Sequence, residues 1–366
     1  MTKMFDYTSD IYPIPLDDLL REAVERGGSD LHIVAKMPPV IRISSDMVQT
    51  DHPPVQPSEV YNLICSILTP EQVQTLKREL ELDFSYAIPG VARFRGNVIF
   101  QRGTLAAAIR VVPFVVPKLE NLGLPQDVER LCGLPRGLVL VTGPTGSGKS
   151  TTLAAMIDYI NEHYALNIVT VEDPIEFLHP HKKSIVRQRE IGIDTHSFAR
   201  ALRQVLRHDP DVIMIGEMRD IESMSIAVTA AETGHLVFST LHTQTAPLTI
   251  SRIVDSFPTG QKEQIRQQLA NSLRAVISQQ LIPHASGKGR VLAVEYMIDT
   301  PAVRSLIREA KEHQLYSAIQ TAQKVGMQTM DQALVNLVRS GKITYESACE
   351  YCIDRQELDR LIKTSL

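Results

Sequence analysis

The stretch from Gly143 to Ser150 constrains this chain more than any other, because it matches the phosphate-loop pattern G-x-x-x-x-G-K-[ST] at every fixed position. The apolar run Gly137–Thr142 precedes it and has the length of a buried strand. The residues from Thr151 to Ile157 are typical of a helix. A strand, a glycine loop and a helix together form the context in which backbone N–H groups and a helix N-terminus bind phosphate.

The residues of this loop have expected roles in binding ATP and Mg²⁺. Lys149 is expected to reach the β- and γ-phosphates, and the hydroxyl of Ser150 to hold Mg²⁺. The glycines let successive backbone N–H groups turn toward one anion. The other residues expected to bind nucleotide are Gly143, Pro144, Thr145, Gly146, Ser147, Gly148 and Thr151.

The bulk composition suits a chain of two or three packed domains, with 366 residues, 43% apolar and 22% charged. A formal net charge of −4 argues against a dedicated nucleic-acid binder, so we expect no nucleic-acid partner. No apolar run reaches the roughly 18 residues of a membrane span, and residues 1–10 lack the core of a signal peptide. We therefore expect a cytoplasmic protein.

Cysteine usage gives no sign of a metal site. Cys349 and Cys352 form an isolated C-x-x-C within a helical pattern, and no second pair is present to complete a structural zinc site. We interpret both as ordinary helix residues.

Three segments follow from the pattern of turns and periodicity. Residues 1–112 are predicted to form an α+β domain with an antiparallel sheet, and residues 113–118, with two prolines, a hinge linker. Residues 119–366 alternate strands and helices after the phosphate loop, which predicts an α/β domain with a parallel sheet. Near its end we expect a helix over Gln261–Gln280 and a strand pair near Leu281–Ile282 and Val291–Ile298, followed by C-terminal helices.

Acidic residues follow two of the predicted parallel strands, at the end where ligands bind in such sheets. Glu172 comes directly after the strand Asn167–Val171 and is positioned to polarise a water aimed at the γ-phosphate. Glu217 ends the stretch Asp211–Glu217, and Gly216 stands where many phosphate-loop enzymes have an aspartate. Glu217 is therefore expected to hold Mg²⁺.

Histidines and arginines complete the candidate site. His242 follows the third strand and is expected at the same sheet edge, whereas His235 precedes that strand and is a weaker candidate, because a lone histidine is more often structural. Phosphoryl transfer also needs a cation for the transition-state charge. The candidates are Arg203, Arg207, Arg219 and Arg252 within the nucleotide domain, and Arg95 or Arg110 supplied by a neighbouring subunit.

Five stretches resemble the secretion ATPase superfamily, and in particular its PilT-type branch, the type IV pilus retraction ATPases. They are the phosphate loop Gly143–Ser150, the acidic stretch Val171–Glu176, the Walker B stretch Asp209–Asp220, the histidine stretch Thr233–Thr243 and the tail Ala302–Glu309. The tail resembles the AIRNLIRE motif associated with retraction and departs from it at Val303 and Ser305. The resemblance covers nearly the whole chain.

The resemblance implies a PAS-like N-terminal domain and a RecA-like ATPase domain with C-terminal helices, assembled as a homo-hexamer. It implies that Glu172 is the general base, that Glu217 handles Mg²⁺, that His242 lies in the catalytic neighbourhood, and that Arg95 and Arg110 contact phosphate. Extension ATPases usually carry a four-cysteine zinc site and a long N-terminal extension, and this sequence has neither, which favours retraction.

The function implied is an ATPase motor that drives retraction and disassembly of type IV pili, and hence twitching motility. Its expected partner is an inner-membrane platform protein of the PilC type, which would hold the motor peripherally at that membrane, and a PilU-like paralogue is a further candidate partner. The arrangement predicts that hydrolysis changes the angle between the two domains about the linker.

Other readings stay open from the sequence. The chain could be a retraction-accessory paralogue of the PilU type. A RecA-like nucleic-acid or conjugation motor would show hydrolysis stimulated by DNA or RNA, and the acidic net charge and the tail motif argue against it. A ring subunit that only binds ATP would lack the base or the Mg²⁺ acid, yet Glu172 and Glu217 are both present.

Overall fold

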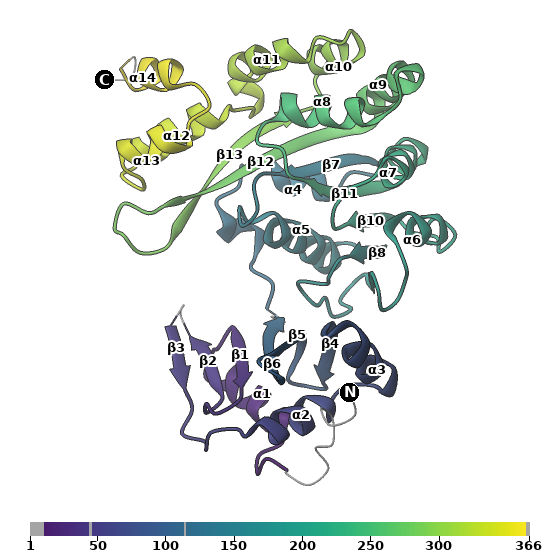
Figure 1. Cartoon of the computed structure of the whole chain (residues 1–366). Coiled ribbons are helices and arrows are strands. Elements are labelled where there is room, and N and C mark those ends of the chain that lie inside the picture. Colours follow the sequence, from purple (N-terminus) through teal and green to yellow (C-terminus); the bar gives the residue numbers. More distant parts are fainter. Residues whose placement is uncertain (1–10, 44–45, 113–114, 364–366) are drawn as a thin grey trace. The chain divides into compact units, whose positions relative to one another are not determined.

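The chain divides into two compact units, Met1–Val115 and Val116–Leu366. The computed structural model describes residues 11–43, 46–112 and 115–363. Each unit has its own sheet (Figure 1). Each also has its own hydrophobic core. The linker predicted at residues 113–118 includes residues 113 and 114, which lie outside the described residues, so its role as a hinge stays a prediction.

The first unit is an α+β domain built on a six-stranded sheet in the order β3-β2-β1-β6-β5-β4, with every neighbouring pair antiparallel. In β5, Phe94 and Val98 are buried in the core and Arg95 and Asn97 are exposed, which is the alternation of a sheet with one covered face. The elements are α1 (Leu16–Glu25), β1 (Asp30–Val34), β2 (Val40–Ile43), β3 (Asp46–Gln49), α2 (Pro57–Cys65), α3 (Pro70–Glu79), β4 (Glu81–Ile88), β5 (Ala92–Gln101) and β6 (Thr104–Val112).

The second unit is built on a seven-stranded sheet in the order β13-β12-β7-β11-β10-β8-β9. All neighbouring pairs are parallel except β12 and β13. The strands are β7 (Gly137–Thr142), β8 (Asn167–Glu172), β9 (Ile185–Glu190), β10 (Val212–Ile215), β11 (Leu236–Leu241), β12 (Leu273–Pro283) and β13 (Arg290–Ile298). The helices are α4 (Val128–Cys132), α5 (Lys149–His163), α6 (Phe198–Val205), α7 (Ile221–Thr233), α8 (Ala246–Ser256), α9 (Lys262–Ser272), α10 (Pro301–Arg308), α11 (Leu315–Thr321), α12 (Met330–Arg339), α13 (Tyr345–Tyr351) and α14 (Arg355–Lys363).

Helices cover both faces of this sheet, which explains why its central strands read as unbroken apolar runs. On one face, Val139 and Val141 of β7 pack in a cluster with α4 and α5. On the other face, Leu138 and Leu140 pack in a cluster with α6 to α11. The expected α/β class, with an α+β N-terminal domain and C-terminal helices, is confirmed.

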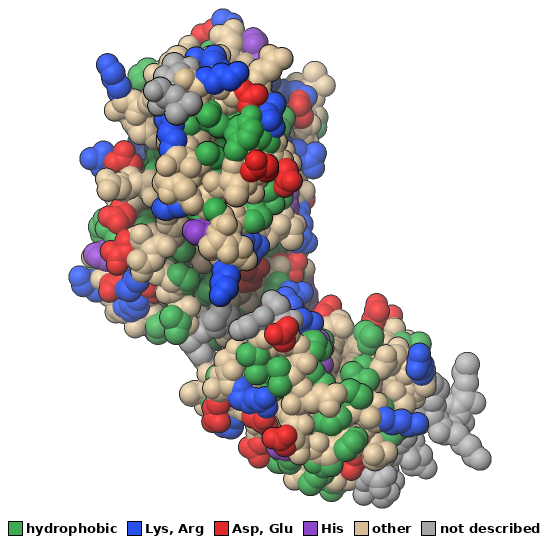
Figure 2. Space-filling model, turned by 90° about the vertical axis from the view of Figure 1, so that its left-hand side faces the viewer, with side chains coloured by type: hydrophobic (Ala, Val, Ile, Leu, Met, Phe, Trp, Pro, Cys, Tyr) green, Lys and Arg blue, Asp and Glu red, His purple; other side chains and the backbone are tan. Residues whose placement is uncertain are grey.

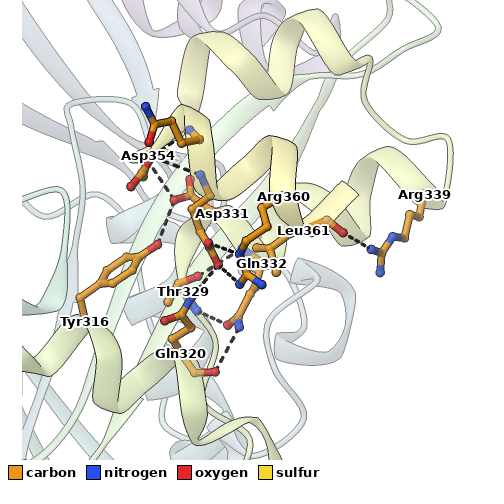
Figure 3. Close-up of polar contacts among 11 residues, drawn as sticks. Tyr316, Gln320, Thr329, Asp331, Gln332, Arg339, Asp354, Arg360 and Leu361 are labelled. Atoms are coloured by element: carbon orange, nitrogen blue, oxygen red, sulfur yellow. Dashed lines mark hydrogen bonds and ion pairs between the residues drawn. The ribbon is translucent and has the colours of Figure 1, made fainter. Parts of the chain in front are cut away.

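The helices α12 to α14 form a C-terminal layer that shares one apolar cluster with β12 and β13. Figure 3 shows the polar contacts around Asp331, at the start of α12. The buried carboxylate of Asp331 accepts the backbone N–H groups of Ile353 and Asp354 at 2.8 and 3.0 Å, and the Tyr316 hydroxyl at 3.1 Å. This one side chain therefore joins α11, α12 and the turn before α14. Cys349 and Cys352 are both free thiols in this layer, packed at the edge of its apolar cluster.

Several elements differ from the sequence-based expectation. The helix expected over Gln261–Gln280 ends at Ser272, and the chain then enters β12 beside β7, where both faces of the strand are buried. The apolar residues of this segment are interrupted by Arg274, Ser278, Gln279 and Gln280, so periodicity did not separate a buried strand from a helix. The strands β3 and β9 and the helices α8 and α14 were not predicted. No helix among the described residues combines the length and the apolarity that a membrane crossing requires.

Candidate active site

The phosphate loop joins β7 to α5 in the strand–loop–helix order that the sequence predicts. Gly148 caps α5 with φ 93°, a left-handed conformation that favours glycine. A Cβ on Gly143 would lie 2.3 Å from the carbonyl oxygen of Gln279 on β12. These two glycines are therefore required by backbone conformation and by close approach, and they leave α5 with its N-terminus open toward the loop.

Lys149 is folded back onto the loop that carries it. Its ammonium group donates hydrogen bonds to the carbonyl oxygens of Gly143 and Pro144, both at 2.9 Å. The side chain is buried, and burial lowers its pKa, while the carboxylates of Glu217 and Glu176 act in the opposite direction. A desolvated cation facing two acids is an arrangement that favours binding of a polyanion carrying a counter-ion.

The parallel register brings the predicted acids and His242 to one edge of the sheet. Residues Ile215 and Ser239 pair across β10 and β11, and Ile215 and Val171 pair across β10 and β8, so all three strands end together. A cavity of about 630 Å³ lies there, large enough for a nucleotide. Its walls include Thr145, Gly146, Gly148, Lys149, Ser150, Thr151, Glu172, Glu217, Arg219 and His242.

Not every loop residue lines this cavity. Gly143 and Pro144 contribute their carbonyl groups to the lysine instead. Ser147 is buried, and its hydroxyl oxygen has no hydrogen-bond partner. Such an unsatisfied group in a phosphate loop is chemically suited to an incoming anion, since burying it without a partner is unfavourable.

Glu217 is the centre of an ion-pair cluster on the cavity wall. Its carboxylate accepts from Arg219 Nε at 2.8 Å and lies 3.1 Å from His242 Nε2. Arg219 also lies 3.5 Å from a carboxylate oxygen of Asp173. The structure therefore joins three predicted site residues, Glu217, Arg219 and His242, in one contact network.

The donor set on this wall suits Mg²⁺ bound together with a nucleotide. The Ser150 hydroxyl and the Glu217 carboxylate are oxygen ligands of the kind that Mg²⁺ prefers. Among the described residues, no group of three or more His, Cys, Asp or Glu side chains could hold a metal by itself. A magnesium ion at this site would therefore complete its shell with phosphate oxygens and water.

Glu172 is the most strongly perturbed acid of the cavity. It ends β8 and is only 7% exposed, and burial raises its pKa to about 7 despite hydrogen bonds that oppose the shift. Its Oε1 atom accepts from Thr170 Oγ1 at 2.7 Å and from Gln188 Nε2 at 3.1 Å. A carboxyl with this pKa is half ionised near neutral pH, which suits a general base.

His235, a possible member of the catalytic neighbourhood, is not among the residues that line the cavity. His235 precedes β11, and its carbonyl oxygen accepts from the N–H of Gly137 at the beginning of β7. The phosphate loop follows the other end of β7. The length of these strands therefore separates His235 from the site, and its Nδ1 lies 3.1 Å from the carbonyl oxygen of Ala230.

Arg95 and Arg110 belong to the first unit, where they are direct cross-strand partners on β5 and β6. Arg110 Nε donates to Asp30 Oδ1 at 2.9 Å, and both arginine side chains lie on the exposed side of their strands. Their expected contact with phosphate stays a prediction. Of the other arginine candidates, Arg203 pairs with Glu222 at the surface.

Sequence reasoning missed several residues of the cavity wall. Arg290 begins β13, and His179 lies in the loop after β8, and both line the cavity. His179 is buried with its Nδ1 unpartnered, and burial lowers its pKa to about 4, so it is neutral at physiological pH. Arg290 follows a glycine turn, and only the pairing of β12 with β7 shows that it reaches this edge.

The model of the family of type II/IV secretion system proteins matches residues 9–350. The chain belongs to this family.

Among known proteins, the chain is 51% identical over 335 residues to the type IV pilus retraction ATPase PilT of Pseudomonas aeruginosa, covering 92% of this chain and 97% of that protein. It is 40% identical over 347 residues to the type IV pilus ATPase PilU of the same organism, covering 95% and 91%. The crystal structure of the pilus retraction motor PilT with bound ADP superimposes with a TM-score of 0.89 at 50% identity, covering 95% of this chain and 99% of that one.

Proposed function

We propose that this chain is an ATPase motor that drives retraction of type IV pili. The observation that carries the proposal is the convergence of Lys149, Glu172 and Glu217 on one nucleotide-sized cavity at the end of a parallel sheet. The match over most of its length to a pilus retraction ATPase supports the pilus as its substrate. The higher identity to PilT than to PilU favours the main motor over the accessory paralogue.

In this proposal the residues bind and orient ATP and a water rather than form a covalent intermediate. The loop amides and Lys149 hold the phosphates, and Ser150 and Glu217 hold Mg²⁺, which neutralises charge on the phosphates when bound. Glu172 accepts a proton from the attacking water. His242, in contact with Glu217, orients that carboxylate toward the metal.

The proposed working form is a homo-hexamer in which Arg95 and Arg110 of one subunit meet the phosphates bound by its neighbour. Both arginines are exposed on adjacent strands, as such a role requires. The linker at residues 113–118 is the proposed hinge, and a PilC-like inner-membrane platform protein is the proposed partner, with a PilU-like paralogue as a second one. The motor would then be cytoplasmic and peripheral at the membrane.

A nucleic-acid motor is the main rival from another class. Lys, Arg, Asp and Glu side chains are interspersed over the face shown in Figure 2, without a broad zone of one sign. A protein that tracks a phosphate backbone usually presents a basic groove or stripe. This distribution, together with the net charge of −4, supports the pilus reading.

The test combines purified protein with a deletion strain. The purified chain should hydrolyse ATP in the presence of Mg²⁺ without stimulation by DNA or RNA. A strain that lacks the gene should carry excess surface pili and lose twitching, and only the wild-type gene, not Glu172→Gln, should restore movement. Normal twitching in the deletion strain, or hydrolysis that requires DNA or RNA, would contradict the proposal.

A further inference from the structure

The buried carboxylate of Glu172 is held from behind by two side-chain donors, both on the same oxygen. Thr170 Oγ1 donates to Oε1 at 2.7 Å and Gln188 Nε2 donates to Oε1 at 3.1 Å. Thr170 is two residues earlier on β8, so its side chain projects from the same face of the strand. Gln188 comes from the neighbouring strand β9, directly opposite Thr170 in the parallel register.

The amide of Gln188 also holds the loop that follows Glu172. Its Nε2 donates to the carbonyl oxygen of Phe177 at 2.8 Å, and its Oε1 accepts the N–H of His179 at 2.9 Å. Both N–H groups of the amide and its oxygen are therefore engaged, and only one amide orientation satisfies all three contacts. Phe177 and His179 line the cavity together with Glu172, whereas Gln188 does not.

We propose that Gln188 is a positioning residue for ATP hydrolysis, which fixes the Glu172 carboxylate and the loop from Asp173 to His179 in one arrangement. The inference rests on the proposed role of Glu172 as the base. With Oε1 engaged by two side-chain donors, the carboxylate cannot rotate freely. The backbone of Glu176 also hydrogen-bonds to this carboxylate, and the charge of the Glu176 side chain raises its pKa. Small errors in the placement of a base lower turnover strongly, because reacting atoms must be aligned.

This role differs in its consequences from that of an ordinary buried amide. Gln188 donates to the ionised form of Glu172, so its hydrogen bond stabilises that form and lowers the pKa of the carboxyl group. Removing the donor therefore raises the pKa. Because the base acts when ionised, the acid limb of the activity profile should move to higher pH, by about half a unit to one unit.

The experiment measures steady-state ATP hydrolysis by the full chain from pH 5.5 to 9 for Gln188→Met and Gln188→Glu. Methionine keeps the length of the side chain and removes both donors, while glutamate adds a like charge beside Glu172. At pH 7 we expect kcat to fall about 5- to 50-fold, with KM and binding of a non-hydrolysable ATP analogue within about twofold of wild type. The acid limb should move upward, more for glutamate than for methionine.

Two matched variants separate positioning from general damage to the fold. Gln328 also carries an amide that donates to a backbone carbonyl, that of Val294 at 2.8 Å, but it lies toward the C-terminal end of the chain. Gln328→Met should therefore leave the acid limb of the activity profile in place. Thr170→Val removes the other donor to Glu172 and should move the limb in the same direction as Gln188→Met. Analogue binding identifies which variants are folded.

The double variant Glu172→Gln with Gln188→Met tests whether Gln188 acts through Glu172. In a Glu172→Gln background, Gln188→Met should have little further effect on residual turnover, because the group it positions is gone. An equal loss in both backgrounds, or an unmoved limb in both Gln188 variants, would overturn the proposal for Gln188. Wild-type turnover in Glu172→Gln alone would instead remove Glu172 as the base, and so refute that part of the proposed function.

Discussion

Two carboxylates of the second unit, Glu172 and Glu295, have similarly raised pKa values but different surroundings. Both are buried, at 7% and 0% exposure, and burial raises the pKa of each to about 7. Glu295 on β13 accepts the N–H groups of Ala246 and Met330, at 2.7 and 3.4 Å, which are the first residues of α8 and α12. Glu172 instead has two side-chain donors and lines the cavity.

The difference teaches that a shifted pKa alone does not mark a catalytic residue. Glu295 is fully enclosed, and its two oxygens are each engaged by the N-terminus of a helix, where a negative charge is favourable. It joins α8 and α12 to β13, and the carboxylate of Asp331 raises its pKa further. Glu172 has the same pKa and access to a cavity, and that access is what suits it to chemistry.

The largest effect is expected from a substitution in the phosphate loop, which should impair the chemistry of the cavity and leave the C-terminal layer folded. Lys149→Ala removes the cation that meets the β- and γ-phosphates, so ATP hydrolysis should fall about 1,000-fold or more. The measurement is turnover of purified protein, with nucleotide binding beside it. The thermal midpoint should stay within a few degrees of wild type. Retention of more than about a tenth of the activity would contradict the assigned role.

Parallel amide substitutions compare the two carboxylates directly. Glu172→Gln removes the base and should lower kcat about 100- to 10,000-fold while ATP-analogue binding persists. Glu295→Gln changes only the enclosed acid, and turnover per folded molecule should stay within about twofold. Turnover and analogue binding are measured on the same preparations. Equal loss in both variants would show that the two carboxylates do not differ in function, and retained activity in Glu172→Gln would show that Glu172 is not the base.

Glu172 and Glu295 should also differ in which property depends on pH, turnover for Glu172 and stability for Glu295. Since Glu172 acts when ionised, kcat should fall about tenfold per unit below its pKa of about 7. For Glu295, the folded-state pKa is raised from 4.5 to about 7, so its stabilising contribution is present below pH 4.5 and is lost as pH rises to 7. The loss is about 1.4 kcal/mol per pKa unit.

Denaturant unfolding at several pH values measures this second effect. Stability of wild type relative to Glu295→Gln should therefore decrease from pH 5 to pH 8, while the acid limb of kcat in Glu295→Gln should match wild type. A stability difference that is independent of pH would show that Glu295 does not titrate in this range.

The smallest effect on hydrolysis is expected at the tail motif. Arg308 is exposed at the end of α10 and does not line the cavity, so Arg308→Ala should change ATP turnover by less than about twofold. Twitching should nonetheless be strongly reduced if α10 transmits motion to the pilus. Lys363→Ala, an exposed cation on α14, is the matched control and should leave both unchanged. Equal loss of turnover and twitching in Arg308→Ala would count against a coupling role.

The sequence was sufficient for the elements whose patterns are unambiguous. The phosphate loop, the acids after β8 and β10, and His242 after β11 could all be placed, because parallel strands carry loop residues to one edge. β9 could not be predicted from Ile185–Glu190, since an edge strand needs no unbroken apolar run. Gln188 was missed with it, because the hydrogen bond to Glu172 depends on which strand lies beside β8.

β12 was missed because residues 273–283 carry no clear period. Arg274, Ser278, Gln279 and Gln280 interrupt their apolar residues, and pairing with β7 decided between a helix and a strand. Arg290 depends on the same pairing. His235 is close to His242 in sequence, but the two histidines lie at opposite ends of β11. The sequence alone did not show that the strand separates His235 from the cavity.

The tethered ammonium of Lys149 has a consequence for how tightly this loop can bind its ligand. Two main-chain carbonyls already accept hydrogen bonds from two of the three N–H donors of the ammonium group. A triphosphate that takes over these two donors exchanges existing contacts for new ones, and the gain is only the difference between them. The loop thus contains an internal competitor for its own cation. Such a competitor weakens affinity while preserving the site's shape, which favours release of spent nucleotide in a machine that must turn over repeatedly.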